Sequence, residues 1–376
     1  MSTLRDKLRS YGKKPASQSG QAQPEKDCLR AFDRTERSAY PLPDILPGAA
    51  VYLLTGLETP DIPLTKMLFL DTETTGLSGG AGTVAFLTGI GYFEDGAFVV
   101  EQDLMRDYPE EAPMLRHIGE RLKKSGLLVT FNGQTFDMPL LESRFIMQGM
   151  RMPNADIPHL DLLKCARSAW RIRLRRCSLA ALEEQVFGLK REDDLPGSQV
   201  PPAFFAYLRT GEFSYVEPIL RHNVQDIRSL PMLLGELTRL YLDPLNAEHA
   251  QDIYSVGRVL EKRGMTESAQ KCYRAADRGT MSRLSRLTLA DSLRRQKDYV
   301  RAAEVYERMT AQGQGGVFPY VELAKLYEHR LGDIPRALAL TRTAVLKCPP
   351  GDGEQMAQLQ KRLFRLYKKI TVQSCR

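Results

Sequence analysis

The sequence predicts two structured regions, an α/β domain built on a mixed sheet and an all-helical repeat domain that follows it. Two apolar segments flank Glu94-Asp95-Gly96 and predict a β-hairpin, after which helix-like and strand-like segments alternate. This order places antiparallel strands beside parallel ones and packs helices on the sheet. Beyond residue 244 the apolar spacing is helical and recurs with a regular period. The length of 376 residues also exceeds what one core usually supports.

The α/β domain is expected to begin with a buried strand that ends at a carboxylate. Met67 to Leu70 is a short apolar run followed directly by Asp71. Val224 to Leu240 has helical apolar spacing, and Pro231 within it predicts a kink or a restart. The other expected elements are strands at 84–93, 97–104 and 127–131 and helices at 112–124 and 137–147.

The helical region repeats its small residues at a nearly constant interval. Ala269, Ala302 and Ala337 stand 33 and 35 residues apart. This matches the roughly 34-residue tetratricopeptide period, in which small residues let paired helices approach closely. A generic helical domain is the alternative.

Composition divides the chain into four expected parts. Residues 1–40 are polar and basic and predict a disordered arm, 41–243 form the α/β domain, and 244–350 form the repeats. Residues 351–376 form a basic amphipathic helix, for which capping the repeats is the plainest role; contact with nucleic acid or an anionic membrane are alternatives. The net charge is +7, yet 41–243 holds 27 acidic and 20 basic residues. Basic flanks of this kind suit a polyanion and equally a solubilising surface.

Several protein classes do not fit the sequence. No apolar run approaches the roughly 20 residues of a membrane span. The first 20 residues lack the apolar segment of a secretory signal, and the six cysteines show neither CxxC pairs nor zinc spacing. We therefore expect a cytoplasmic protein with reduced thiols.

Four acidic residues are the main candidates for chemistry. Asp71 and Glu73 lie two apart on a strand and so point to one face. Carboxylates gathered with Asp137 and Asp226 would repel one another unless cations neutralise them, and hard oxygen ligands suit Mg²⁺ or Mn²⁺. Taken singly, Asp137 could be a helix cap, and a D-x-E pair could merely end a strand. His222 lies four residues before Asp226, on the same helical face, and is a candidate to deprotonate water or else a helix cap.

These segments resemble a known superfamily. Asp71-Thr72-Glu73-Thr74-Thr75-Gly76-Leu77, Phe131-Asn132-Gly133 with Phe136-Asp137, His159-Leu160-Asp161-Leu162, and His222-Asn223 with Asp226 resemble the DEDD 3′–5′ exonucleases, and more narrowly the YprB-like family. The resemblance covers about residues 66–240 and implies a ribonuclease H-like fold. It also implies that Asp71, Glu73, Asp137 and Asp226 hold two Mg²⁺ or Mn²⁺ ions and that His222 handles the nucleophilic water. The chain departs from the pattern at one place, since histidine takes the four-residue slot of the tyrosine branch and Arg221 stands at the five-residue slot of the histidine branch.

Substrate contacts are expected beside the carboxylates and along a basic stretch. Lys164 to Arg176 holds six basic residues and no acidic one, and Trp170 among them could stack a base. A solvated helix face is the alternative for this stretch, and hydrogen bonding within the fold is the alternative for His159 and Asp161. The candidate substrate-binding residues are Thr74, Asn132, His159, Asp161, Arg171 and Arg175.

The sequence thus predicts a two-metal 3′–5′ exonuclease that acts on single-stranded 3′ ends of DNA or RNA. The helical repeats are expected to offer a surface for a protein partner. The alternative is an adaptor that binds nucleic acid or protein and whose nuclease-like domain has little or no activity.

Overall fold

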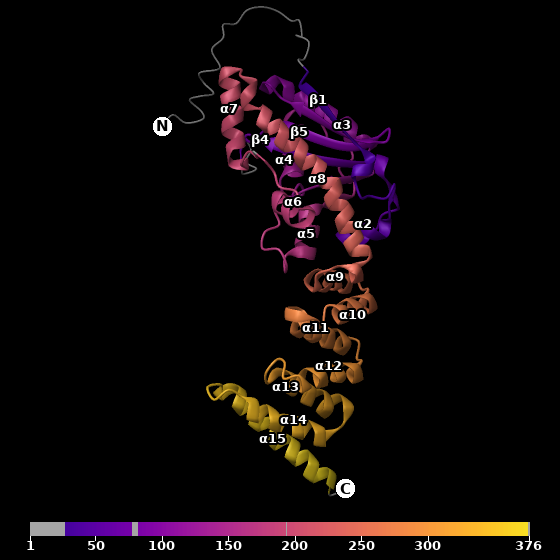
Figure 1. Cartoon of the computed structure of the whole chain (residues 1–376), viewed down its shortest axis with the longest axis vertical. Coiled ribbons are helices and arrows are strands. Elements are labelled where there is room, and N and C mark those ends of the chain that lie inside the picture. The colour runs from indigo at the N-terminus through magenta and orange to yellow at the C-terminus, as the bar shows by residue number, and fades with distance from the viewer. Residues whose placement is uncertain (1–26, 77–81, 193, 375–376) are drawn as a thin grey trace, which may run out of the picture.

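The computed structural model describes residues 27–76, 82–192 and 194–374 (Figure 1). The α/β domain lies at one end of an elongated molecule, and the C-terminal helices extend away from it in a stack. The expected mixed sheet and the helical region after it are both confirmed.

One sheet of six strands forms the centre of the α/β domain. The strand order is β1-β6-β5-β4-β7-β8, with β4 parallel to β7 and β7 parallel to β8, while the other neighbours are antiparallel. The strands are β1 (Leu29–Glu36), β4 (Met67–Thr74), β5 (Ala85–Glu94), β6 (Ala97–Leu104), β7 (Leu127–Thr130) and β8 (His159–Asp161); β2 (Ile45–Leu46) and β3 (Ile62–Pro63) pair separately.

Helices cover both faces of this sheet because the central strand is apolar on both sides. On β4, Phe69 packs into the cluster that contains α2, α5 and α8, whereas Leu68 and Leu70 pack into the one with α3, α4 and α7. The helices of the domain are α2 (Gly48–Thr55), α3 (Glu111–Lys124), α4 (Asp137–Met147), α5 (Leu162–Trp170), α6 (Leu179–Phe187), α7 (Val200–Thr210) and α8 (Glu217–Leu242).

Two elements differ from their sequence expectations. Residues 29–36 lie within the expected arm yet form the edge strand β1, which pairs with β6 and is held by Arg30 bound to Asp103 at 2.8 Å. Residues 1–26 of that arm lie outside the described part. The expected restart is wrong, because α8 continues through Pro231 as one helix, while the kink stays a prediction. Buried Leu230 and Leu233 pack this stretch against the domain, which stabilises the helix where proline removes a backbone donor.

The C-terminal region consists of antiparallel helices stacked in sequence. Ala269, Ala302 and Ala337 are fully buried between them, and a Cβ on Gly257 would lie 2.8 Å from Cys272 Cβ, so small residues do allow close helix approach here. The tetratricopeptide assignment itself stays a prediction. The helices are α9 (Ala250–Lys262), α10 (Thr266–Ala275), α11 (Ser282–Arg295), α12 (Tyr299–Ala311), α13 (Phe318–Leu326), the π-helical turn η8 (Tyr327–Leu331), α14 (Ile334–Lys347) and α15 (Gly353–Ser374).

The last helix is fixed to the stack by one buried carboxylate. Glu328 of η8 accepts bonds from Arg362, Arg365 and Lys369 at 2.8 Å each, so part of the basic charge of α15 is neutralised within the fold. Neither α15 nor any other helix in the described ranges is both long and apolar enough to cross a membrane.

The two regions share a continuous core at their junction. Helix α9 packs against α5, and the buried residues Trp170, Tyr241 and Ile253 belong to one apolar cluster. Arg173, just after α5, binds Asp252 of α9 through two nitrogens at 2.9 Å. The orientation of the helical stack relative to the sheet is therefore set by packed side chains and not by a linker.

Candidate functional site

The site lies at the C-terminal end of the central strand β4, where the first turn of α4 and the N-terminal half of α8 also lie. The alternation of β4 that buries Phe69 toward α8 also turns Asp71 and Glu73 to that side, while Thr72 points toward α4. The D-x-E pair thus stands on one face, as its spacing predicts.

Asp137 joins the pair from the start of α4. The chain turns sharply after β7, with Asn132 at φ +70° and Gly133 packed so tightly that a Cβ would lie 2.6 Å from Thr130. The carboxylate of Asp137 then accepts bonds from the Thr72 amide at 3.1 Å and the Thr72 hydroxyl at 2.5 Å. Its side chain is therefore held by the neighbouring strand, which goes beyond the capping role considered for it.

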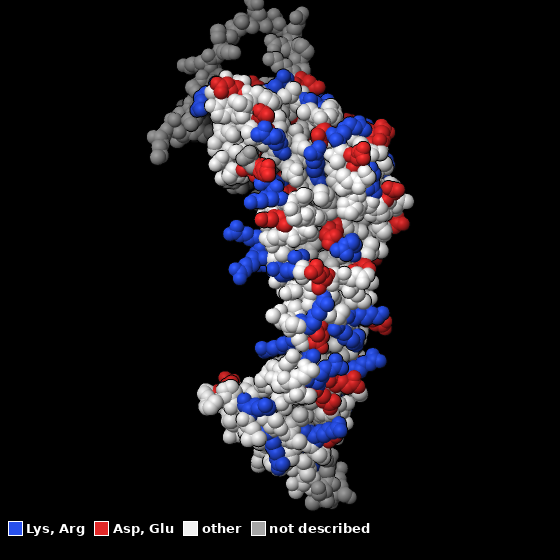
Figure 2. Space-filling model, in the orientation of Figure 1, with Lys and Arg blue, Asp and Glu red and all other residues white. Residues whose placement is uncertain are grey.

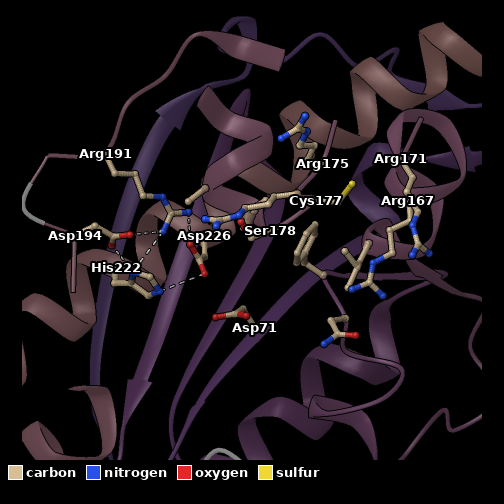
Figure 3. A pocket seen from close by; sticks show the side chains of 16 residues that line it. Asp71, Arg167, Arg171, Arg175, Cys177, Ser178, Arg191, Asp194, His222 and Asp226 are labelled. Atoms are coloured by element: carbon tan, nitrogen blue, oxygen red, sulfur yellow. Dashed lines mark hydrogen bonds and ion pairs between the residues drawn. The ribbon is translucent and has the colours of Figure 1, made fainter. Parts of the chain in front are cut away.

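His222 and Asp226 come from one face of α8. His222 Nε2 lies 3.6 Å from Asp226 Oδ2 and 3.9 Å from Glu73 Oε1. Its Nδ1 lies 2.5 Å from a carboxylate oxygen of Asp194, an acceptor that orients the ring. Asp71, His222 and Asp226 face a common space (Figure 3).

A buried asparagine fixes the orientation of Asp71. Asn223 of α8 is fully buried and donates to Asp71 Oδ2 at 2.9 Å, while its own oxygen accepts from Gln102 at 2.9 Å. This contact depends on Gly89, because a Cβ at that position would lie 2.2 Å from Asn223 Oδ1. Helix α8 can therefore approach the sheet closely enough to bring Asp226 to Asp71.

Arg191 is a resident cation that the sequence reasoning did not identify. Its guanidinium lies 2.5 Å from Asp226, 2.5 Å from the buried Glu183 and 3.4 Å from His222 Nδ1. The residue lies on the irregular segment between α6 and α7, where no periodicity marks it. Thr72 and Asn223 belong to the sequence segments that resemble the DEDD exonucleases, but the sequence alone did not predict their contacts with Asp137 and Asp71.

Burial and mutual repulsion favour the neutral forms of the carboxyl groups. Burial raises the pKa of Glu73 to about 7 and that of Asp137 to about 6. Burial, followed by the charges of Asp226, Asp137 and Glu73, raises the pKa of Asp71 well above its usual value. Burial also raises the pKa of Asp226, although His222 and Arg191 oppose the shift. The four predicted carboxylates thus interact as one cluster.

The donor set of this cluster fits hard divalent cations. As the side chains stand, no group of three or more His, Cys, Asp or Glu in the described ranges is arranged to hold an ion. Arg191 occupies one oxygen of Asp226 and Thr72 occupies one of Asp137, yet both carboxylates retain a second oxygen. Buried carboxylate oxygens that repel one another are ligands that Mg²⁺ or Mn²⁺ would neutralise.

The other predicted site residues divide into two groups. Asn132 lines a hollow of about 880 Å³ together with Asp71, Arg171 and Arg175, and Thr74 lines a second hollow of about 220 Å³ beside Asp137. His159 and Asp161 instead serve the fold: His159 Nε2 lies 2.8 Å from the Thr130 hydroxyl, and Asp161 accepts the amides of Asn132 and Leu163. Their hydrogen bonds match the structural alternative.

The basic stretch provides one wall of the larger hollow. Arg167, Arg171, Arg175 and Arg176 are exposed and line it. Figure 3 shows Arg167, Arg171 and Arg175 on the side of the hollow away from His222 and Asp226. The expected stacking by Trp170 is wrong, because that side chain is 1% exposed and packs in the core beneath α9. Phe131 also lines the larger hollow, and half-exposed Phe136 lines the smaller one.

Comparison with known proteins agrees with this architecture. Residues 68–238 match the family model of the RNase_H superfamily, and the α/β domain is a ribonuclease H-like domain. The chain is similar to YprB of Bacillus subtilis (strain 168), described as an uncharacterized protein, with 27% identity over 312 residues that cover 81% of this chain and 75% of the relative. A family B DNA polymerase from Pyrobaculum calidifontis matches with a TM-score of 0.38 and 16% identity, over 55% of this chain and only 30% of the polymerase. That last likeness is too slight to support an argument.

Proposed function

We propose that the ribonuclease H-like domain is a divalent-metal-dependent 3′–5′ exonuclease that hydrolyses phosphodiester bonds in single-stranded DNA or RNA. The observation that carries the proposal is the gathering of Asp71, Glu73, Asp137 and Asp226 near the C-terminal end of β4. Burial raises the pKa of each of them. A cluster of this kind is unfavourable by itself and becomes favourable when cations neutralise it.

The residues of the site have distinct expected roles. Asp71, Glu73, Asp137 and Asp226 would hold two Mg²⁺ or Mn²⁺ ions, which when bound supply Lewis-acid activation of water and neutralise charge on the phosphate. Asn223 orients Asp71, and Thr72 orients Asp137. His222 donates Nδ1–H to Asp194, which leaves Nε2 facing Glu73 and Asp226 to accept a proton from water.

The arginine wall opposite the carboxylates suits the substrate backbone. Arg167, Arg171 and Arg175 are exposed and line the hollow. One guanidinium group can donate two parallel hydrogen bonds to the oxygens of a phosphate. A strand lying between this wall and the carboxylates would bring its terminal phosphodiester to Asp71.

Degradation of end-labelled strands tests the proposal. With Mn²⁺, 5′-labelled single-stranded DNA or RNA is expected to shorten stepwise from its 3′ end, and Asp71→Ala is expected to abolish the shortening. Asp156→Ala, which changes an exposed carboxylate outside the site, is the matched control. Absence of metal-dependent shortening, or equal shortening by Asp71→Ala, would exclude the enzyme and leave the adaptor alternative.

A further inference from the structure

The arginine wall of the site continues beyond the α/β domain onto the helical region. A further hollow of about 820 Å³ is lined by Arg167 and Arg171 from α5 and its end, and by Arg258, Lys262 and Arg295 from α9 and α11. Arg167 and Arg171 line both this hollow and the one that contains Asp71. The two hollows are therefore adjacent along the surface.

Helix geometry aligns the basic side chains of the two regions. Arg167 and Arg171 stand four residues apart, as do Arg258 and Lys262, so each pair shares one helix face. Helix α9 packs directly against α5, and Arg173 bound to Asp252 fixes their contact. In Figure 2, basic side chains project from one edge of the molecule at the height of α5 and α6.

Most of these cations have no carboxylate partner within the described residues. No ion pair is found there for Arg167, Arg171, Arg175, Arg176, Arg258 or Lys262, whereas Arg295 is paired with Glu261 at 2.7 Å. Many other exposed basic residues are paired locally, for example Arg221 with Glu217 and Lys123 with Glu120. Like charges left unpaired side by side repel one another, which a polyanion would relieve.

We propose that single-stranded nucleic acid lies along this basic path, which runs from the carboxylate site over α5 and onto α9 and α11. The path is defined by Arg167, Arg171, Arg175, Arg176, Arg258, Lys262 and Arg295. It rests on the proposed function at one end, where the 3′ terminus reaches Asp71, and assigns the helical region a direct role in holding the strand. Exposed Ile172 lines the same hollow as these cations and offers an apolar surface to a base.

Strand length distinguishes this path from the site alone. Labelled oligothymidylate and oligouridylate of about 4 to about 30 nucleotides are bound in EDTA, so that no cleavage occurs, and fluorescence anisotropy reports affinity. Each phosphate contact contributes about −0.7 to the slope of log affinity against log salt, or about five-fold in affinity at 0.1 M salt. For long strands the double variant R258Q/K262Q is expected to bind about 25-fold more weakly, with a slope shallower by about 1.4. Strands too short to reach beyond the carboxylate site are expected to bind R258Q/K262Q and the wild type with equal affinity.

The matched control is K271Q/R274Q, which removes two exposed cations from α10 and none from the path. Equal affinity of the wild type and R258Q/K262Q for long strands would overturn the path, as would equal losses at every length. So would polyglutamate binding as tightly as the long strand, since that would mean a surface for acidic polypeptides. Cleavage of short strands without any length effect leaves the exonuclease intact and refutes the path. Length-dependent binding without cleavage supports the path and refutes the exonuclease.

Discussion

His222 is the residue at which the site departs most from a simple carboxylate cluster. Burial lowers its pKa, but the charges of Asp226, Asp194 and Glu73 outweigh burial and raise it. Its ring contacts carboxylates at both nitrogens, through Asp194 at Nδ1 and through Glu73 and Asp226 at Nε2. These contacts place the histidine beside the carboxylates, where it can exchange a proton without binding a metal ion itself.

His222→Ala is expected to lower turnover by about 10²- to 10⁴-fold, the usual contribution of a proton-transfer group, while metal binding persists. Turnover is measured on end-labelled strands and metal binding by calorimetry with Mn²⁺. Asp194→Asn removes the negative charge beside Nδ1, which also faces Arg191 at 3.4 Å, but keeps an acceptor oxygen, and it is expected to give a smaller loss. Unchanged turnover in His222→Ala would remove the histidine from the mechanism.

Arg191 gives a second prediction at this scale, because its guanidinium competes with a metal ion for Asp226. Arg191→Met is expected to strengthen Mn²⁺ binding several-fold and to lower the metal-free unfolding free energy by about 3–5 kcal/mol, since Glu183 stays buried without its partner. Calorimetry and urea unfolding measure the two effects. Arg191→Lys keeps the charge and is expected to change both less. Unaltered metal affinity in Arg191→Met would show that the arginine does not block the site.

At the scale of elements, β6 carries an ionic cluster beneath α3. The buried carboxylates of Glu101 and Asp103 contact His117 of α3 at 3.1 and 2.5 Å, with Arg30 and Arg121 also bound to them. Burial alone would lower the pKa of His117, but the bonds to Asp103 and Glu101 raise it to about 9. The protonated histidine thus helps to hold the helix on the sheet.

A pH dependence of stability follows from this shift. A histidine whose pKa rises from about 6.5 in the unfolded chain to about 9 in the fold stabilises fully below about pH 6.5 and loses that contribution as the pH rises through 9. Urea unfolding between pH 6 and 10 is expected to show a decline on the order of 2 kcal/mol from this group. His117→Gln should remove this part of the decline. An identical pH profile in that variant would mean that other groups cause it.

Sequence patterns predicted those elements whose geometry is set locally. Strand alternation placed Asp71 and Glu73 on one face, and helical spacing placed His222 beside Asp226, because both periods are properties of the backbone. Trp170 was misassigned since its burial depends on α9, which packs over it from a different region. Arg191 was missed because it reaches Asp226 from an irregular segment, and only the fold brings the two together.

At the scale of the whole molecule, the shared core predicts that the α/β domain and at least the first helices of the stack unfold together. Asp252 is buried and its partner Arg173 closes the junction between α5 and α9. Asp252→Ala leaves that arginine without its partner and is expected to cost about 1–3 kcal/mol, since Arg173 is partly exposed and water can reach it. Calorimetry is expected to show one transition for both regions that shifts downward as a whole, whereas Asp243→Ala, at an exposed position close to the junction, should leave it unchanged. If the wild type already melts in two separate steps, the regions are independent and a rigid basic path across them would lose its structural basis.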